Sequence, residues 1–288
     1  KNFKTKEELG GSGKFLHINP VYNYSYRGPA NMGEEDYIIK SVSDVESLVK
    51  KRNDIAGILI ELIQVTGGVI PQLKPYIKKL EEICKENNIT FIVDEVQTAF
   101  GWLGTIFASD YYEIKPDIIA LGKGLSAGFP ALAATVFKGE YDNLNYGESE
   151  YTFGGEPLAC KVALANINYL KSSGILQTIP EKHEHFLDRL QKIKQKYKQI
   201  DDVRGLGLVL GIKFAGQTTF NDWDWGKEES KITERVYQNA FKNHLILRKA
   251  ACNGISDVLI VKPPITITHD EIEKSMNLLD KTLEECLR

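Results

Sequence analysis

Short apolar runs alternate with amphipathic stretches through the first half of the chain. Four runs of strand length, rich in isoleucine, valine and alanine, occupy residues 55–61, 90–94, 117–121 and 131–137. Apolar residues recur at helical spacing over residues 75–88, and a shorter helix is predicted over residues 38–50. Apolar strands that alternate with helices are typical of an α/β fold with a largely parallel sheet.

The second half of the chain has a more mixed pattern. Residues 157–172 predict a long linking helix, because proline suits a first helical turn and apolar residues recur to the end of the stretch. The elements predicted beyond it are helices over residues 183–197, 232–243 and 270–286 and strands over residues 206–214 and 258–261. We therefore expect a large domain over residues 1–172 and a smaller α+β domain over residues 173–288. The segment before about Asn31 predicts irregular structure.

Charge and cysteine content narrow the classes of function. Lys and Arg total 36 against 39 Asp and Glu, so the net charge of -3 favours neither nucleic acid nor an anionic membrane as a partner. A small-molecule partner is expected instead. The four cysteines form no CxxC pair, which fits neither a zinc site nor a disulfide framework and favours a reducing cytoplasm. The sequence has no apolar stretch long enough for a membrane span.

Polar side chains follow three of the predicted strands. Glu61 and Gln64 end the first run, Asp94 and Gln97 the second, and Lys123 stands between two glycines after the third. Ligands of open α/β sheets bind at the carboxyl ends of the strands, where burial turns a lysine into a nucleophilic amine. A neighbouring aspartate suits the pyridinium nitrogen of pyridoxal 5'-phosphate (PLP). These positions alone leave a structural lysine and a helix-capping aspartate open as alternatives.

Nucleotide-binding loops do not account for these glycines. A phosphate loop of the form G-x4-G-K-[ST] would need glycine at Asp117 and serine or threonine at Gly124. The glycines of residues 205–211 miss the G-x-G-x-x-G spacing by one position and lack a surrounding βαβ unit. Neither nucleotide fingerprint is present.

Two longer stretches carry a specific resemblance. Residues 91–101 read FIVDEVQTAFG and residues 116–124 read PDIIALGKG. They are similar to the signature of the class III (ω-amino) aminotransferases, which are PLP-dependent enzymes of fold type I. Four further segments resemble family motifs in the family's order, at residues 61–68, 151–160, 203–208 and 263–268. The resemblance extends from about Tyr24 to the end of the sequence.

The resemblance implies roles for five residues at the cofactor and substrate. Lys123 is expected to bind PLP as a Schiff base, the internal aldimine, and to shuttle a proton between the substrate carbon and the cofactor. Asp94 would pair with the pyridine nitrogen, Val96 would pack on the ring face, and Gln97 would bond the ring hydroxyl. Glu61 would orient Gln97 or the substrate amine.

The resemblance also implies a second subunit. The family threonine that matches Thr152 reaches the cofactor phosphate of the neighbouring subunit, so a homodimer is expected, although a turn hydroxyl is also consistent with Thr152. The Ser-Gly-x-Glu-Ala helix start that cradles the phosphate in the family is absent from this sequence. The chain is therefore expected to be a fragment, a cleaved product or half of a split enzyme that assembles with a chain supplying this segment. By itself it is expected to bind PLP weakly or not at all.

Several positions depart from the family pattern. Members that act on glutamate-like acids carry a paired arginine and glutamate where this sequence has Ile260 and Thr66. Lys262 offers a point charge for an anion without the bidentate geometry of arginine. Glu156 replaces the usual asparagine, and Trp102 and Leu103 stand in place of a smaller, basic stretch. Lys262 and Trp102 are therefore expected near the substrate, in a reshaped entrance.

These features predict an aminotransferase that moves an amino group from an amine or amino acid to an oxo acid. The alternatives are a PLP-dependent lyase, epimerase or aminomutase on the same scaffold, or a non-catalytic partner. Trp223 and Trp225 lie in a polar insertion with either a packing or a substrate role. His183 and His185, two apart on a predicted helix, make a poor metal pair and are expected to be solvated. Asp201 and Asp202 are expected to be exposed charges in a loop.

Overall fold

A computed structural model describes residue 16 and residues 32–145, 148, 151–215, 231–250 and 257–287. The expectation for the opening segment, apart from Leu16, and the expectations for Trp223 and Trp225 lie outside the described residues. None of the helices in this part of the chain is long and apolar enough to cross a membrane.

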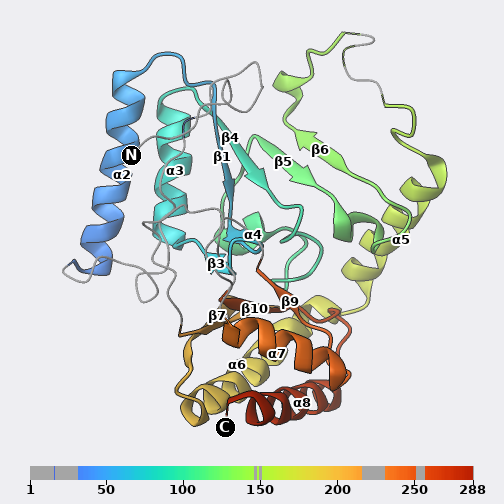
Figure 1. Ribbon diagram of the computed structural model, residues 1–288. Coiled ribbons are helices and arrows are strands. Elements are labelled where there is room, and N and C mark those ends of the chain that lie inside the picture. The colour runs from blue at the N-terminus through green and yellow to red at the C-terminus, as the bar shows by residue number, and fades with distance from the viewer. Residues whose placement is uncertain are drawn as a thin grey trace.

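The first sheet has four strands in the order β1-β4-β5-β6 (Figure 1). Their bounds are β1 Gly57–Glu61, β4 Thr90–Asp94, β5 Ile118–Leu121 and β6 Ala134–Phe137. β1, β4 and β5 run parallel and β6 runs antiparallel to β5, which confirms the prediction of an α/β fold with a mostly parallel sheet. The carboxyl ends of the three parallel strands face the second sheet (Figure 1).

Helices cover this sheet and a short hairpin follows its first strand. α2 (Glu34–Lys51) and α3 (Lys74–Glu86) pack side by side at one end of the sheet, and α5 (Pro157–Ser172) lies at the other (Figure 1). α3 buries its apolar face in one core cluster with strand β4 because its apolar residues recur at helical spacing. The smaller elements are β2 Ile63–Gln64, β3 Ile70–Pro71, α4 Ala108–Tyr112, η1 Lys123–Ser126, η2 Gly139–Tyr141 and η3 Ile175–Thr178.

The second sheet is antiparallel, in the order β7-β8-β10-β9. Its strands are β7 Ile200–Leu206, β8 Val209–Phe214, β9 Arg248–Lys249 and β10 Val258–Val261. Helices α6 (Ile179–Lys196), α7 (Lys231–Lys242) and α8 (His269–Leu287) pack together beneath it and share its hydrophobic core (Figure 1). The expected boundary between two domains at residue 172 stays a prediction.

The strand predicted over residues 206–214 is present as β8, which begins at Val209, but it is the second strand of a β-hairpin whose first strand, β7, was not predicted. Strand β7 was missed because its acidic residues resembled a loop. Asp201 instead forms an ion pair with Lys213 across the hairpin, and the carboxylate of Asp202 lies 2.9 Å from the guanidinium of Arg204. The first pair joins β7 to β8 and the second lies within β7, and a cross-strand charge pair such as the first stabilises the pairing of two strands.

The turn of this hairpin docks on the loop that follows β4. Gly207 has φ +54, and a Cβ built there would lie 2.1 Å from the carbonyl oxygen of Trp102, so no larger residue fits. The next residue, Leu208, donates its backbone N–H to the same oxygen at 2.9 Å. Arg204 also bridges the sheets, donating to the carbonyls of Gly68 at 2.5 Å and Val69 at 2.8 Å. These contacts fix the second sheet against the strand ends of the first.

Candidate active site

The strand ends of the first sheet bring together the residues that the sequence predicted there. Glu61 is the register partner of Asp94, and Asp94 is the register partner of Ala120. Lys123 follows β5 after a single glycine. The carboxyl ends of β1, β4 and β5 therefore place two carboxylates and one amine in a row along one edge.

The turn that carries Lys123 is held from two sides. Lys123 has φ +42, a left-handed conformation that is uncommon for a residue with a side chain and recurs at functional sites. A Cβ built on Gly122 would lie 3.5 Å from Cγ1 of Val96, so the turn lies against the loop after β4. From α5, the amide of Asn166 donates to the carbonyl of Gly124 at 2.8 Å. The position of the amine is thus fixed by two separate elements.

Two consecutive acidic residues, Asp94 and Glu95, anchor the loop after β4, and their side chains have different partners. Asp94 Oδ1 accepts the backbone N–H of Val96 at 2.9 Å. Glu95 is fully buried and accepts the N–H groups of Ala108 at 2.6 Å and Ser109 at 2.8 Å, at the start of α4, together with the Ser109 hydroxyl at 2.5 Å. The sequence prediction missed Glu95. Its signal was a second acid beside Asp94, since successive side chains of an extended chain point to opposite faces.

A cavity of about 380 Å³ opens at these strand ends. This volume falls in the usual range of small-molecule sites, which is about 300–1,000 Å³. Five residues expected at the site or its entrance line the cavity: Val96, Gln97, Trp102, Lys123 and Lys262. Its other lining residues are Val65, Gly124, Ile246, Leu247, Arg248 and Ile260. The second sheet thus supplies one wall and the first sheet the other.

Glu61 has an unusual proton affinity. Burial, and then the nearby charge of Asp94, raise the pKa of Glu61 to about 7, although the charge of Lys123 and a backbone hydrogen bond from Val65 act in the opposite direction. Glu61 therefore exchanges a proton near neutral pH, beside the amine of Lys123.

The raised pKa of Glu61 makes a stability prediction. Between about pH 4.5 and pH 7 the carboxyl of Glu61 is ionised in the unfolded chain but still protonated in the folded protein. The free energy of unfolding therefore decreases as the pH rises through this range, and the loss is constant above it. Glu61→Gln should therefore raise the unfolding midpoint at pH 8 relative to wild type and leave it nearly unchanged at pH 4.5. Thermal unfolding over this pH range would test it, with the exposed Glu82→Gln as control. An equal effect of Glu61→Gln at both pH values would contradict the assignment.

Lys262 reaches the cavity from the second sheet and contacts the loop after β4. Its ammonium donates to the carbonyl of Gln97 at 2.7 Å and lies 3.9 Å from the ring centroid of Trp102. Burial, and then the charges of Lys123 and Arg248, lower the pKa of Lys262 to about 7. Lys262 and Trp102 therefore contact each other and line the same cavity, where the sequence predicts residues near a substrate.

Comparison with known proteins decides the family. The family model for class III aminotransferases matches residues 4–283. This chain belongs to the class III aminotransferases. Members of this family depend on PLP, and this class III aminotransferase chain has their fold type I architecture. It is 32% identical over 250 residues to acetylornithine aminotransferase of Clostridium acetobutylicum, covering 85% of this chain and 60% of that protein.

Another relative of the class III chain is named for a different amine. It is 30% identical over 274 residues to 4-aminobutyrate aminotransferase GabT of Escherichia coli, covering 95% of this chain and 63% of that protein. Among solved structures, a Bacillus anthracis aminotransferase superposes with a TM-score of 0.81 at 26% identity, covering 95% of this chain and 62% of that one. The chain thus spans about three fifths of the length of these relatives.

The residues of this class III chain suit the family's cofactor. A primary amine and the apolar side chain of Val96 line one cavity, and the carboxylate of Asp94 is held at the adjoining strand end by the N–H of Val96. An aldehyde-bearing, aromatic cofactor with a ring nitrogen requires this set of an amine, an apolar face and a carboxylate. The amide nitrogen of Gln97 donates to Thr66 at 2.8 Å, a partner that the sequence prediction did not identify.

Thr152 lies apart from the cavity of its own chain. It sits in an exposed turn before α5, and its neighbours Tyr151 and Phe153 are 78% and 83% exposed. The two aromatic side chains form an apolar surface at the position where the family pattern predicts contact with a second subunit. Glu156, in place of the usual asparagine, accepts the N–H of Ala159 at 2.7 Å and caps α5.

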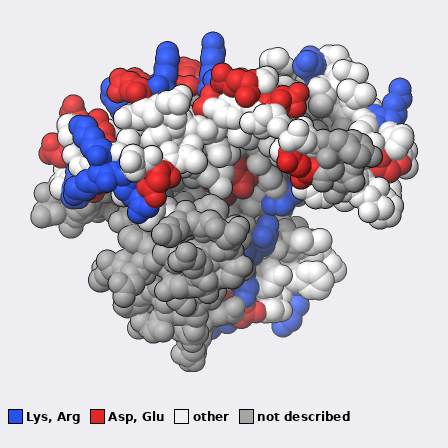
Figure 2. All heavy atoms as spheres, turned by 90° about the horizontal axis from the view of Figure 1, so that it is seen from above, with Lys and Arg blue, Asp and Glu red and all other residues white. Residues whose placement is uncertain are grey.

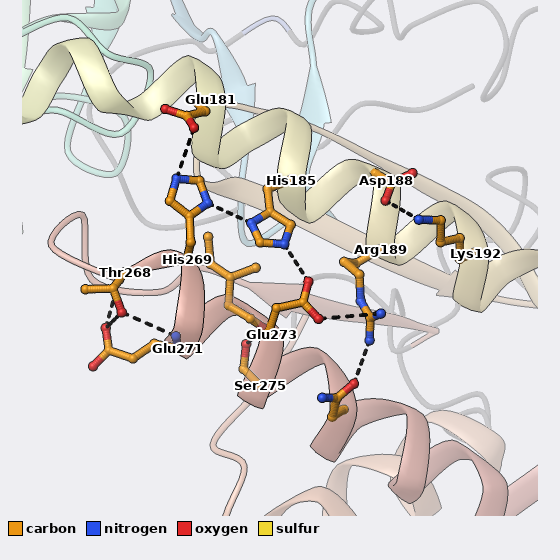
Figure 3. Close-up of polar contacts among 12 residues, drawn as sticks. Glu181, His185, Asp188, Arg189, Lys192, Thr268, His269, Glu271, Glu273 and Ser275 are labelled. Atoms are coloured by element: carbon orange, nitrogen blue, oxygen red, sulfur yellow. Dashed lines mark hydrogen bonds and ion pairs between the residues drawn. The ribbon is translucent and has the colours of Figure 1, made fainter.

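The expectation that the two histidines of α6 are solvated is wrong. Nδ1 of His183 lies 2.8 Å from the carbonyl oxygen of Gly207. His185 bonds His269 through the two Nδ1 atoms at 2.7 Å and bonds Glu273 at 2.5 Å (Figure 3). His269 and Glu273 both belong to α8, and the local spacing of residues in the sequence cannot predict a contact with so distant a helix. Figure 3 shows His185 and His269 within the packing between α6 and α8.

Charged residues are mixed over the surface. On the face shown in Figure 2, basic and acidic side chains are interspersed over the described part of the molecule. The described residues on this face show no region of one sign that would attract nucleic acid.

Proposed function

We propose that this chain carries the catalytic part of a PLP-dependent aminotransferase that moves an amino group between an amine or amino acid and an oxo acid. One observation carries the proposal: the amine of Lys123 lines a cavity at the strand end next to Asp94 and Glu61. The names of its relatives, including acetylornithine and 4-aminobutyrate aminotransferases, support the same reaction class.

Each residue has a proposed task around the cofactor. PLP supplies the electron sink that stabilises negative charge on the substrate carbon. Lys123 holds the cofactor covalently and moves the proton at that carbon, as a general acid and base. Asp94, fixed by the N–H of Val96, keeps the ring nitrogen protonated, while Val96 packs on the ring and Gln97 bonds its hydroxyl. Glu61 accepts a hydrogen bond from the donor's ammonium when it is ionised.

Covalent trapping and turnover test this function. After incubation with PLP and reduction with borohydride, peptide mass spectrometry should find the pyridoxyl mass on Lys123. Amine donors should then be consumed only when an oxo acid, pyruvate or 2-oxoglutarate, is also present. Label on another lysine would contradict the proposal. No label on Lys123, either in the chain alone or after addition of a chain that supplies a further segment, would favour the non-catalytic alternative.

A lyase, epimerase or aminomutase is the second candidate. The apolar Ile260 and the Thr66 hydroxyl stand where relatives acting on glutamate-like acids were expected to have an ion pair, so a standard acceptor lacks its usual clamp. The second candidate predicts product from the amine alone, with no oxo acid added. The turnover assay above therefore separates the two reaction classes.

We further propose a homodimer, or an assembly with a chain that supplies a further segment, in the cytoplasm. The exposed aromatic residues Tyr151 and Phe153 beside Thr152 support the contact, and the free thiols of Cys84, Cys160 and Cys286 suit a reducing compartment. Light scattering after gel filtration should give twice the chain mass for a homodimer. Phe153→Ser should shift the mass toward that of one chain, and an unchanged mass would exclude this surface as the interface.

A further inference from the structure

We infer that a second cavity, apart from the candidate active site, binds a small planar molecule that carries a hydrogen-bond donor beside an acceptor. A primary carboxamide and the edge of a nucleobase both present this pair of groups. The cavity has a volume of about 380 Å³, within the usual range of small-molecule sites of about 300–1,000 Å³. The described residues that line it all differ from those that line the cavity at Lys123. It is called the second cavity below.

Four parts of the fold enclose the second cavity. The end of β3 and the start of α3 line it together with α4, and α6 and β7 supply the rest of its wall. β3 contacts β7 beside it. Tyr111 of α4 and Leu187 of α6 are both partly buried, and they line the cavity with an aromatic ring and an aliphatic chain. Apolar surfaces of this kind suit a flat ring, whose orientation is then fixed by a few polar groups.

The main polar group is the side chain of Gln72, which lines the second cavity and is 3% exposed. Its backbone is held by two bonds, since the N–H donates to the carbonyl of Leu62 at 2.9 Å and the carbonyl accepts the hydroxyl of Tyr112 at 2.9 Å. Within the described part of the chain, neither the oxygen nor the nitrogen of its side-chain amide has a hydrogen-bond partner. A buried amide without partners costs free energy, and such groups are rare outside functional sites. Gln72 therefore offers a donor and an acceptor to a ligand.

The charges that line the second cavity already have partners. The guanidinium of Arg204 lies 2.9 Å from the carboxylate of Asp202 and donates to two backbone carbonyls. The ammonium of Lys74 lies 3.7 Å from the carboxylate of Glu113 and 4.5 Å from the ring centroid of Tyr111. A charged ligand would have to displace these partners, whereas a neutral ligand leaves them in place. The arrangement therefore favours a neutral molecule that pairs with the free amide.

Titration of the whole chain, followed by the NMR signals of the ligand, tests the second cavity with two probes. Benzamide represents a carboxamide and adenine represents a nucleobase. At least one probe should bind saturably, and Gln72→Leu should weaken that binding about 10- to 100-fold, because it leaves the donor and acceptor of the probe unpaired. Methyl benzoate, which keeps the acceptor of benzamide but lacks the donor, should bind more weakly than benzamide. Binding of benzamide alone assigns the site to a carboxamide, and binding of adenine alone assigns it to a nucleobase.

Two further variants and a stability measurement control this titration. Gln177→Leu, at an exposed position of η3, should bind the probes like wild type. Leu187→Trp, which fills the cavity from α6 and keeps Gln72, should abolish binding. Without a probe, Gln72→Leu should unfold at the same temperature as wild type or higher, because it removes a buried amide that has no partner.

Three results would overturn the inference. They are the absence of binding of both probes at millimolar concentration, equal binding by wild type and Gln72→Leu, and a lower unfolding temperature of Gln72→Leu, which would show that the amide serves the fold through a bound water. The titration needs no PLP. Failure of PLP to label Lys123 would therefore overturn the proposed function and leave this inference standing.

Discussion

Lys123→Ala is expected to abolish covalent attachment of PLP and to lower oxo-acid-dependent turnover by about 10²- to 10⁴-fold or more. Loss of a positioned general acid and base alone produces an effect of this size. The turn around Lys123 is set by backbone contacts and by Asn166, so the truncated side chain leaves the fold in place. Turnover and the mass of borohydride-reduced peptides measure the two effects separately.

Two controls sharpen this test. Lys85→Ala, at an exposed position of α3, should behave like wild type in both assays. Addition of a small primary amine such as methylamine should restore part of the turnover of Lys123→Ala, because it supplies the missing base from solution. A variant that keeps the wild-type rate would show that another residue moves the proton.

Glu95→Ala is expected to destabilise the protein by about 2–5 kcal/mol. The substitution leaves two backbone N–H groups at the start of α4 and the Ser109 hydroxyl without their buried acceptor, at about 1–3 kcal/mol for each unsatisfied group. Burial raises the pKa of Glu95, so removal of the buried carboxyl offsets part of this cost. Urea unfolding measures the change. The exposed Glu82→Ala, which loses only an ion pair with Lys79, should cost less than about 1 kcal/mol. A similar small cost for Glu95→Ala would mean that water replaces the carboxylate.

Elements with a clear apolar pattern were predictable from the sequence. Strands β4 and β10 and helix α5 have the predicted bounds, because each is an uninterrupted apolar or amphipathic run between polar residues. The convergence of Glu61, Asp94 and Lys123 was also predictable, since the carboxyl ends of parallel strands share an edge. The family resemblance added the chemistry to that edge.

Features that depend on distant partners were not predictable. Strand β7 alternates buried apolar residues, Ile200 and Val203, with charged residues whose partner is known only from the folded sheet, as for Asp201 and Lys213 of β8. Arg248 could be placed beside Ile260 only from the register of two strands separated by a segment with no pattern. His185 acquires its partners from α8, more than 80 residues later in the chain. In each case the determining contact lies outside the window that local periodicity reports.

The hairpin turn at Gly207 and the bond from Lys262 to Gln97 join the two sheets at the mouth of the cavity. A molecule that contacts both walls of the cavity therefore opposes the separation of the two sheets. Its binding free energy adds to the free energy needed to separate them. At a concentration 100 times its dissociation constant, such a ligand would stabilise the closed arrangement by about 2.7 kcal/mol. Amide hydrogen exchange should then slow in β5 and β9 together, because a ligand that bridges the two walls reduces motion between the two sheets.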